Sequence, residues 1–369
     1  MTYDAIVVGL GAMGSATAFH LARRGLLVLG LDRFSPPHAF GSSHGETRII
    51  REAYFEHPMY VPMVQHAYSL WRDLEKESGT PLLLDTGGVM IGRPDSDLVQ
   101  GSRRSAELHG LPHELLMAAE VRERFPALCP DADMVAVWEP RAGVLFANAC
   151  ITAHLAQARR YGAELRYAEP MLSWEPNGER IRVHTSQGEH QARQLIVTAG
   201  AWISAFFPDL PLRVERQVLF WFDEASASEM FAPHHCPVHL WEFDGRRFFY
   251  GFPDVGNGVK VAFHHGGEIT TVDTMRREVA NSEVQDILSA KRRFLAGRDA
   301  KLRATTVCMY TNTPDEHFWI DRYPGNKQVL IASACSGHGF KFAPVIGEVL
   351  ADLVEGKQPG LDMDLFRAR

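Results

Sequence analysis

The sequence is poor in cysteine: its five cysteines are scattered and odd in number, and no two form a C-x-x-C pair. This pattern predicts neither a disulfide framework nor a zinc site, and we expect no bound metal. Basic residues are outnumbered, and the net charge of −7 argues against nucleic acid or an anionic membrane as partner. No run approaches the roughly 20 apolar residues of a membrane helix. Since the fold is expected to begin by Tyr3, with no room for a signal peptide, we expect a cytoplasmic protein.

Residues that can form a core are plentiful. Hydrophobic residues make up 46% of the 369 residues and charged residues 22%, which is typical of a globular protein with a substantial core. The length is enough for two domains, or for one large domain with an insertion. The sequence contains no internal repeat and no low-complexity tract.

The first 32 residues predict a nucleotide-binding unit. Its parts are a strand, a glycine-rich turn, a helix, a second strand and an acid, at Ala5–Val8, Gly9-Gly11-Gly14, Ser15–Arg24, Leu26–Leu31 and Asp32. The G-x-G-x-x-G spacing allows a tight turn, close approach to a pyrophosphate and close helix packing, and the acid can bind a ribose. The helix start adds free N–H groups for phosphates. The complete order favours this interpretation over an ordinary βα turn, but it does not decide between FAD and NAD(P).

Two later loops also suit an anionic ligand. Residues 41–54 gather small, hydroxyl and basic side chains that can follow a cofactor; the alternative is a solvated loop with surface arginines. Near the C-terminus the strand Val329–Ala332 runs into the loop Ser333–Gly339 and then into a helix, Pro344–Leu353. With Lys341, this loop can hold negative charge, such as that on the pyrimidine end of a reduced flavin. The alternative is a glycine-rich turn.

The middle of the chain has a different character. Between residues 212 and 310, many short aromatic strands predict an antiparallel sheet, interrupted by one helix at Val272–Leu295. The strand Val259–His264 has a period of two, which places Lys260 and His264 on the face opposite its apolar residues. That face presents an amine and an imidazole to a cavity or, equally compatible with the pattern, to solvent.

Further elements are expected around this sheet. The segment Ser96–Arg124 is expected to be helical, broken at Gly110-Leu111-Pro112, and Val135–Val144 is expected to form a strand pair. Cys308 lies in an apolar strand, where a cysteine is most often a small core residue, and the same applies to Cys335.

Seven segments, long and in order, are shared with a known family. They are PPH at 36–38, SHGETRIIREAY at 43–54, YVP at 60–62, YGFP at 250–253, CMYT at 308–311, PDEHFWID at 314–321 and SGHGFKF at 336–342. With them the chain resembles monomeric sarcosine oxidase and N-methyl-L-tryptophan oxidase, flavoenzymes of the D-amino-acid-oxidase-like group. The likeness covers nearly the whole chain. For the two loops, for the face of Lys260 and His264 and for Cys308, it favours the functional interpretation over the alternative. Cys335 is the exception.

The resemblance implies FAD, joined through a thioether to Cys308, whereas Cys335 is left structural. It implies that Lys260 activates oxygen as a fixed cation beside the flavin ring, and that Arg51 and Lys341 bind the substrate carboxylate. The other catalytic side chains that it implies are Arg48, His44, Tyr250 and His264. The expected cofactor contacts are Gly9, Gly11, Ala12, Met13, Gly14, Asp32, Arg33, Ser42, Ser43, Thr47, Met171, Gly200, Trp202, Cys308, Gly337, Gly339, Phe340 and Lys341.

Leu240 is expected to contact the substrate. The wall around it, Leu240-Trp241-Glu242-Phe243 and Arg246-Arg247, differs from both relatives and leaves the substrate side chain open.

The expected fold is α/β, with a discontinuous Rossmann-like FAD-binding domain and an antiparallel-sheet substrate (α+β) domain. The first comprises residues 1–80, 145–211 and 311–369, and the second residues 81–144 and 212–310. The resemblance implies a monomeric oxidase of N-methyl amino acids, with molecular oxygen as second substrate. Alternatives are a related oxidase of pipecolate, proline or fructosyl amino acids, a dehydrogenase that passes electrons to a carrier protein, and a non-catalytic flavin-binding subunit.

Overall fold

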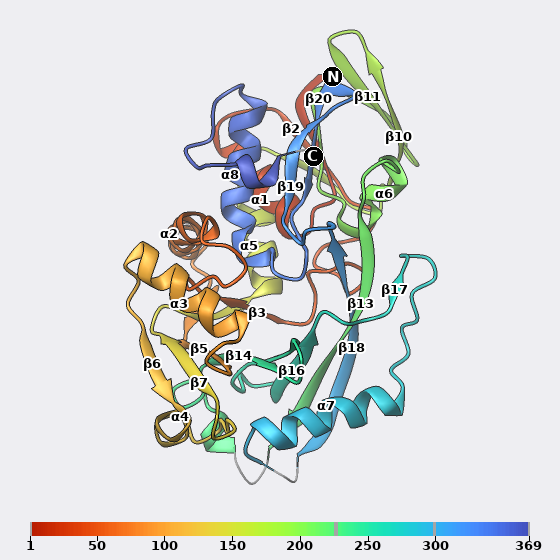
Figure 1. The fold of residues 1–369 in the computed structure, drawn as a ribbon. Helices are drawn as coiled ribbons and strands as arrows, with labels where there is room; N and C mark the ends of the chain where they lie inside the picture. Colours follow the sequence, from red (N-terminus) through yellow and green to blue (C-terminus); the bar gives the residue numbers. More distant parts are fainter. Residues whose placement is uncertain (1, 225–227, 298–299, 368–369) are drawn as a thin grey trace.

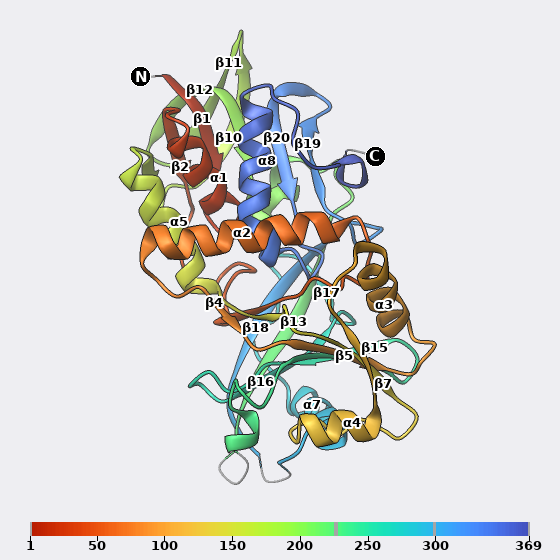
Figure 2. The same ribbon diagram turned by 90° about the vertical axis from the view of Figure 1, so that its left-hand side faces the viewer.

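The computed structural model describes residues 2–224, 228–297 and 300–367. Two parts are seen in Figure 1: one contains both termini, a sheet and the long helices, and the other contains a second sheet with helices on its far side. Figure 2 shows helix α2 (Tyr60–Ser78) running across the molecule between the two parts. No helix in the described residues is both long and apolar enough to cross a membrane.

Eight strands form the first sheet. Its order is β10 (Met171–Asn177), β11 (Arg180–Thr185), β12 (Gly188–Val197), β1 (Thr2–Val8), β2 (Val28–Leu31) and β9 (Glu164–Arg166), with β20 (Asn326–Ser333) paired to β12 and β19 (Trp319–Tyr323) to β20. β1 is parallel to β2 and β12, and β12 is parallel to β20. Val8 lies opposite both Leu31 and Val197, so the carboxyl ends of these strands meet at one edge. Ligands of parallel sheets bind at such an edge.

Three helices pack together beside this sheet: α1 (Ala12–Arg23), α5 (Ala147–Arg160) and α8 (Ala343–Val354). Figure 2 shows α1 and α8 side by side. Their backbones approach closely because position 347 is a glycine: a Cβ there would lie 2.6 Å from the Ala16 carbonyl carbon. This packing fixes the N-terminus of α1 at the carboxyl edge of the sheet.

Nine strands form the second sheet. Its order is β17 (Ile269–Thr270), β13 (Arg213–Asp223), β16 (Val259–His264), β15 (Arg247–Gly251), β14 (Val238–Phe243), β5 (Gly88–Gly92), β7 (Val135–Glu139) and β6 (Glu114–Met117), with β18 (Lys301–Asn312) paired to β13. All pairs are antiparallel except β14 with β5. The predicted antiparallel sheet is thus confirmed, with one parallel pair of strands.

The remaining elements are short or peripheral. Helices α3 (Asp97–His109), α4 (Ala118–Arg124) and α7 (Asn281–Phe294) flank the second sheet, and α6 (Ile203–Phe206) follows β12. A small sheet has the order β3 (Thr47–Ile50), β8 (Gly143–Phe146) and β4 (Leu83–Asp85). Because it takes strands from both sides of the expected boundary near residue 80, it ties the two parts together; the division into two domains stays a prediction.

Two sequence-based expectations were wrong in detail. The segment expected to be helical up to Arg124 contains strand β6, because pairing with β7 overrides the helical preference of Glu114–Met117. The helix expected from Val272 begins only at Asn281. The guanidinium of Arg216 donates to the carbonyls of Arg276 and Glu278, which a helix would have used for itself.

Candidate active site

Two joined cavities lie at the carboxyl edge of the first sheet, where the two parts of the molecule meet. Both are lined by Ala12, Ser42, Ser43, Thr198 and Gly200. The result is one elongated space, with a nucleotide-like end against α1 and a second end that reaches β16, β18 and the loop before α8.

The backbone at the nucleotide-like end leaves room for a ligand at one glycine. A Cβ on Gly14 would lie 1.8 Å from the carbonyl oxygen of Gly9, so this glycine serves the packing of α1 against the turn. A Cβ on Gly11 would meet only the Ser43 hydroxyl, at 3.5 Å, and Gly11 lines the cavity. The N-terminus of α1 therefore opens onto free space, as a pyrophosphate requires.

Asp32 lies at the end of β2 and is 5% exposed. Its carboxylate accepts N–H bonds from Leu10 at 2.7 Å and Phe34 at 2.8 Å, and it lines the cavity. Nearby, the guanidinium of Arg33 lies 5.1 Å from the centre of the Trp202 ring. Met171 lines the same space. These residues fit the adenosine half of FAD, and none of their positions obstructs it.

At the end of the cavity near β16, Lys260 lies behind the residues that line the space. Its side chain is on the side of β16 that the alternation predicts. Its Nζ is 2.7 Å from the Gly45 carbonyl oxygen, and 2.8 and 3.2 Å from the carbonyl and hydroxyl oxygens of Thr47. Burial, and then the charge of Arg48, lower the pKa of Lys260 well below its ordinary value. A buried amine held by three oxygens can accept a proton when negative charge develops beside it.

Arg48 is fixed by three carbonyl oxygens, those of Ser42, His44 and Thr47, at 2.6 to 2.7 Å. It lines the cavity, and its guanidinium lies 5.7 Å from the centre of the Phe340 ring. This arrangement places a permanent positive charge in the wall, next to the glycine-rich loop that contains Gly337 and Gly339.

Tyr250 and His264 line the cavity together with Leu240. His264 Nδ1 lies 3.2 Å from the hydroxyl oxygen of Tyr310. Burial raises the pKa of Tyr250 to about 12, and burial, then His265, lower the pKa of His264 well below its usual value. Both groups are therefore neutral near pH 7 and can act as hydrogen-bonding walls.

His44 does not line this space. It borders a third cavity beside Gly45 and Glu46, and its Nε2 has no hydrogen-bond partner among the described residues. Burial, then Arg48, lower its pKa to about 4. His44 is thus a neutral imidazole next to the loop that holds Lys260.

Arg51 and Lys341 both line this cavity. Arg51 already donates to the carboxylate of Glu56, and Lys341 donates to the Tyr54 hydroxyl at 3.2 Å and to the His338 carbonyl at 2.8 Å. Burial, and then Arg51, lower the pKa of Lys341 to about 7.

Cys308 and Cys335 both line the cavity. The Cys308 Sγ lies 3.4 Å from the Ser42 carbonyl oxygen, and the Cys335 Sγ accepts the N–H of Thr311 at 3.4 Å. Geometry alone therefore leaves both thiols accessible to a cofactor in this space, and the preference for Cys308 comes from the sequence motif.

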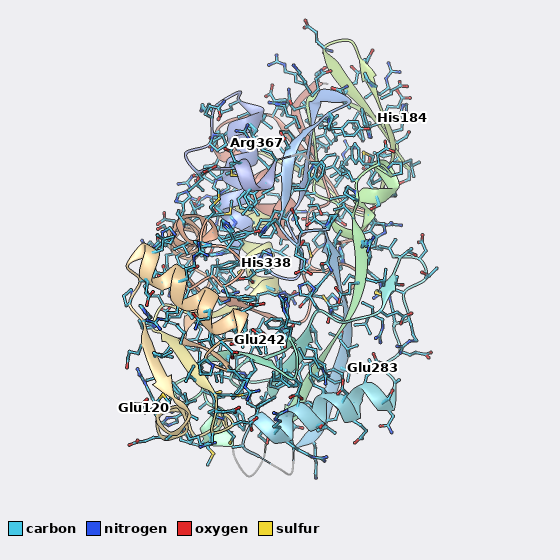
Figure 3. All side chains as sticks on the ribbon, in the orientation of Figure 1. Glu120, His184, Glu242, Glu283, His338 and Arg367 are labelled. Atoms are coloured by element: carbon cyan, nitrogen blue, oxygen red, sulfur yellow. The ribbon has the colours of Figure 1, made fainter. Side chains whose placement is uncertain are left out.

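Sequence reasoning missed four residues of this site. Tyr54, Glu56, Tyr310 and His338 all lie at or beside the cavity, and His338 is found near the middle of the molecule in Figure 3. Three of them lie within the segments shared with the family, and this membership was the signal that could have identified them. Their roles depend on partners distant in the sequence.

The expectation that the segment around Leu240 forms the wall of the cavity was wrong for most of its residues. Leu240 lines the cavity, but Trp241 is fully buried against Phe294 in the core of the second part, and Glu242 accepts the N–H of Leu98. The alternation along β14 turns Trp241 and Phe243 to the face opposite Leu240. Glu242 shares the face of Leu240, but its carboxylate is used by the backbone of Leu98. Arg246 and Arg247 pair with acidic side chains at the surface, with Asp97 and Asp286.

One group of possible metal ligands lies outside the cavity in the described residues. Both imidazoles of His234 and His235 lie within 3.4 Å of a carboxylate oxygen of Glu229, and all three residues are exposed. The carboxylate already pairs with both rings, so the cluster is explained without an ion.

Comparison with known proteins agrees with the family resemblance that the sequence motifs indicate. A family model described as FAD dependent oxidoreductase matches residues 4–353. Monomeric sarcosine oxidase of Streptomyces avermitilis is 46% identical over 358 residues, which is 95% of this chain and 93% of that protein. N-methyl-L-tryptophan oxidase of Yersinia pestis is 34% identical over 369 residues, 99% and 98% of the two chains. The resemblance that the motifs indicate is confirmed.

Solved structures support the fold. The open form of NikD, an amino acid oxidase essential for nikkomycin biosynthesis, has a TM-score of 0.86 at 21% identity and covers 100% of this chain and 98% of that one. Glycine oxidase from Geobacillus kaustophilus has a TM-score of 0.82 at 20% identity, with coverage of 100% and 98%. At these identities the likeness concerns the fold alone.

Proposed function

The chain belongs to the FAD dependent oxidoreductase family, and on this premise we propose that it oxidises N-methyl amino acids. The products are the demethylated amino acid, formaldehyde and hydrogen peroxide. The observation that carries this proposal is the meeting of Arg51 and Lys341 in the cavity that also contains Cys308. Two cations specify the carboxylate end of an amino acid, and the elongated space beside them fits FAD.

When bound, FAD would accept a hydride equivalent from the N-methyl carbon and return the electrons to oxygen as hydrogen peroxide. Hydrolysis of the resulting imine by one water would give formaldehyde and the demethylated amino acid. Arg51 and Lys341 fix the carboxylate, which turns the N-methyl group toward the remainder of the cavity and makes the reaction effectively unimolecular. His264 and Tyr250 are neutral, so they can surround an uncharged secondary amine without protonating it. The buried walls exclude water around the reacting atoms.

The proposal also covers the electron acceptor, the covalent link to the flavin, and the oligomeric state and location of the protein. Lys260 supports oxygen as acceptor, because its amine can take up a proton where negative charge develops. The cavity position of Cys308 supports a thioether to the flavin. We further propose a monomer that acts in the cytoplasm on an N-methyl amino acid and oxygen, which agrees with the net charge of −7.

An aerobic substrate panel tests the function. Purified protein is mixed with sarcosine, N-methyl-tryptophan, pipecolate, proline and a fructosyl amino acid, and both hydrogen peroxide and formaldehyde are measured. We expect both products in equal amounts from an N-methyl amino acid. Peroxide without formaldehyde, from a ring amine only, would reassign the substrate class. Flavin bleaching by substrate without any peroxide would indicate a dehydrogenase instead.

A further inference from the structure

The ammonium of Lys341 has a defined set of hydrogen bonds. It donates one N–H to the Tyr54 hydroxyl oxygen at 3.2 Å and one to the His338 carbonyl oxygen at 2.8 Å. An ammonium carries three N–H groups. In the described part of the chain no further acceptor bonds Lys341, and the side chain lines the cavity. One N–H group therefore remains for a ligand.

His338 fixes the direction of the bond between Lys341 and Tyr54. Its Nε2 lies 3.0 Å from the Glu316 carbonyl oxygen, which can only accept, so Nε2 carries the proton. Burial and the neighbouring Lys341 lower the pKa of His338 well below its usual value, so the ring is neutral and Nδ1 is an acceptor. The Tyr54 hydroxyl lies 2.7 Å from Nδ1 and donates to it. A lone pair of its oxygen is then left for Lys341.

The ring of Tyr54 also lies against both cations of the pair. Its centre is 4.3 Å from the guanidinium carbon of Arg51 and 5.1 Å from Lys341 Nζ. The negative face of an aromatic ring attracts cations, which offsets the repulsion between them. The backbone of this segment is held by Ser105, whose hydroxyl donates to the Tyr54 carbonyl at 2.5 Å, and by Glu139, which accepts the N–H of Ala53.

We propose that Tyr54 is the positioning residue of the carboxylate site: its hydroxyl, oriented by His338, holds Lys341 so that one N–H of the ammonium faces the cavity, and its ring keeps Arg51 beside it. This inference rests on the proposed function, since it names the groups that prepare the cation pair for the carboxylate of an amino acid. It assigns Tyr54 and His338 no contact with the reacting atoms.

The pH dependence of ligand binding reports on this arrangement. The charged groups that act on Lys341 are Arg51 and Arg48, which lower its pKa, and Glu56 and Glu139, which raise it; burial acts first, and the pKa is about 7. Only the ammonium form binds a carboxylate well, so affinity falls as the pH rises through this pKa. Removing the Tyr54 hydroxyl removes an acceptor that favours the ammonium. The fall in affinity then begins at lower pH.

The experiment uses the flavin-loaded enzyme and acetate, a carboxylate without an oxidisable amine. The Kd is measured between pH 6 and 9 from the change in flavin absorbance, for wild type and Tyr54→Phe, which keeps the ring and loses the hydroxyl. Tyr60→Phe is the matched control, since it removes a neighbouring hydroxyl that bonds His317. We expect Tyr54→Phe to raise the Kd about tenfold or more and to shift the pH profile downward, with Tyr60→Phe unchanged.

Two variants of His338 test the orientation of the hydroxyl. His338→Asn keeps an acceptor near the Nδ1 position and should retain most of the affinity, whereas His338→Leu should behave like Tyr54→Phe. In turnover, the KM for the amino acid should rise much more than kcat falls. Equal acetate affinity and an unchanged pH profile in Tyr54→Phe would overturn the proposal, as would equal losses in the Asn and Leu variants. If wild type binds acetate but oxidises no N-methyl amino acid, the proposed function fails while these acetate results still decide the role of Tyr54.

Discussion

Arg51 and Glu56 form an ion pair inside the cavity. Nη2 of the guanidinium lies 2.7 and 2.6 Å from the two carboxylate oxygens, and both residues line the cavity. If Arg51 binds the substrate carboxylate as proposed, that carboxylate meets a nitrogen that already donates to both oxygens of Glu56. We therefore expect Glu56, five residues from Arg51, to compete with the substrate carboxylate for this arginine.

Glu56→Gln should strengthen the binding of carboxylate ligands. The amide keeps the size of the side chain but loses the charge, so Arg51 is released at a smaller cost. We expect the Kd for acetate and the KM for the amino acid to fall roughly three- to tenfold, which corresponds to about 1 kcal/mol. Arg51→Lys is the companion variant and should raise both values, since lysine lacks the two-pronged donor. Weaker binding in Glu56→Gln would show that Glu56 orients Arg51 rather than competes for it.

Cys308→Ser should abolish the covalent link, and Cys335→Ser should leave it intact. Both thiols line the same cavity, so the second variant controls for loss of a thiol near the flavin. After denaturation in acid, we expect the yellow colour to stay with the polypeptide in wild type and Cys335→Ser and to be released from Cys308→Ser. Release from wild type, or retention in Cys308→Ser, would remove Cys308 from this role.

Lys260→Met should slow the reoxidation of the flavin about 100-fold or more and change its reduction by substrate far less. The amine is held by Gly45 and Thr47 and is not among the residues that line the cavity with Arg51 and Lys341. Loss of one such preorganised electrostatic group typically costs two to three orders of magnitude in rate. Stopped-flow spectroscopy separates the two half-reactions. Equal slowing of both half-reactions in Lys260→Met would contradict the assignment.

Much of this site could be predicted from local sequence patterns. The order of strand, glycines, helix and acid locates Gly11 and Asp32 at the nucleotide end, because these features follow from backbone geometry over about 30 residues. The alternation in β16 correctly places Lys260 and His264 opposite Val259 and Val261, although it does not show whether their face meets a cavity or solvent. Both inferences need only the neighbouring residues.

What could not be predicted depends on contacts between distant residues. Tyr54 acts through His338, 284 positions away, and no periodicity links the two. The start of α7 is set by Arg216, which binds carbonyls about 60 residues further along the chain. Most residues around Leu240 do not line the cavity. The alternation along β14 turns Trp241 and Phe243 to the opposite face, and Glu242 is taken by a contact with the distant Leu98.

Gly11→Val should reduce flavin binding without unfolding the protein. Gly11 has φ −70, which any residue adopts, and a Cβ there has only the Ser43 hydroxyl within 4 Å, at 3.5 Å, at a position that lines the cavity. Gly14→Ala is the contrasting variant, since its Cβ would collide with the Gly9 carbonyl and the Thr198 hydroxyl. We expect at least about tenfold less flavin per polypeptide in Gly11→Val with a Tm close to that of flavin-free wild type, and a lowered Tm in Gly14→Ala. Full flavin content in Gly11→Val would place the pyrophosphate elsewhere.

His20 should make the protein sensitive to acid. It is buried on α1, its Nε2 has no partner among the described residues, and burial lowers its pKa to about 4. The unfolded chain has the ordinary value of about 6.5, so the folded state binds fewer protons between these values. The stabilisation is complete above pH 6.5 and is lost as the pH falls toward 4, by on the order of 3 kcal/mol. Tm measured from pH 7.5 to 5 should fall less steeply in His20→Leu than in wild type, whereas His234→Leu, at an exposed position, should follow wild type; parallel curves for wild type and His20→Leu would exclude His20 as the source.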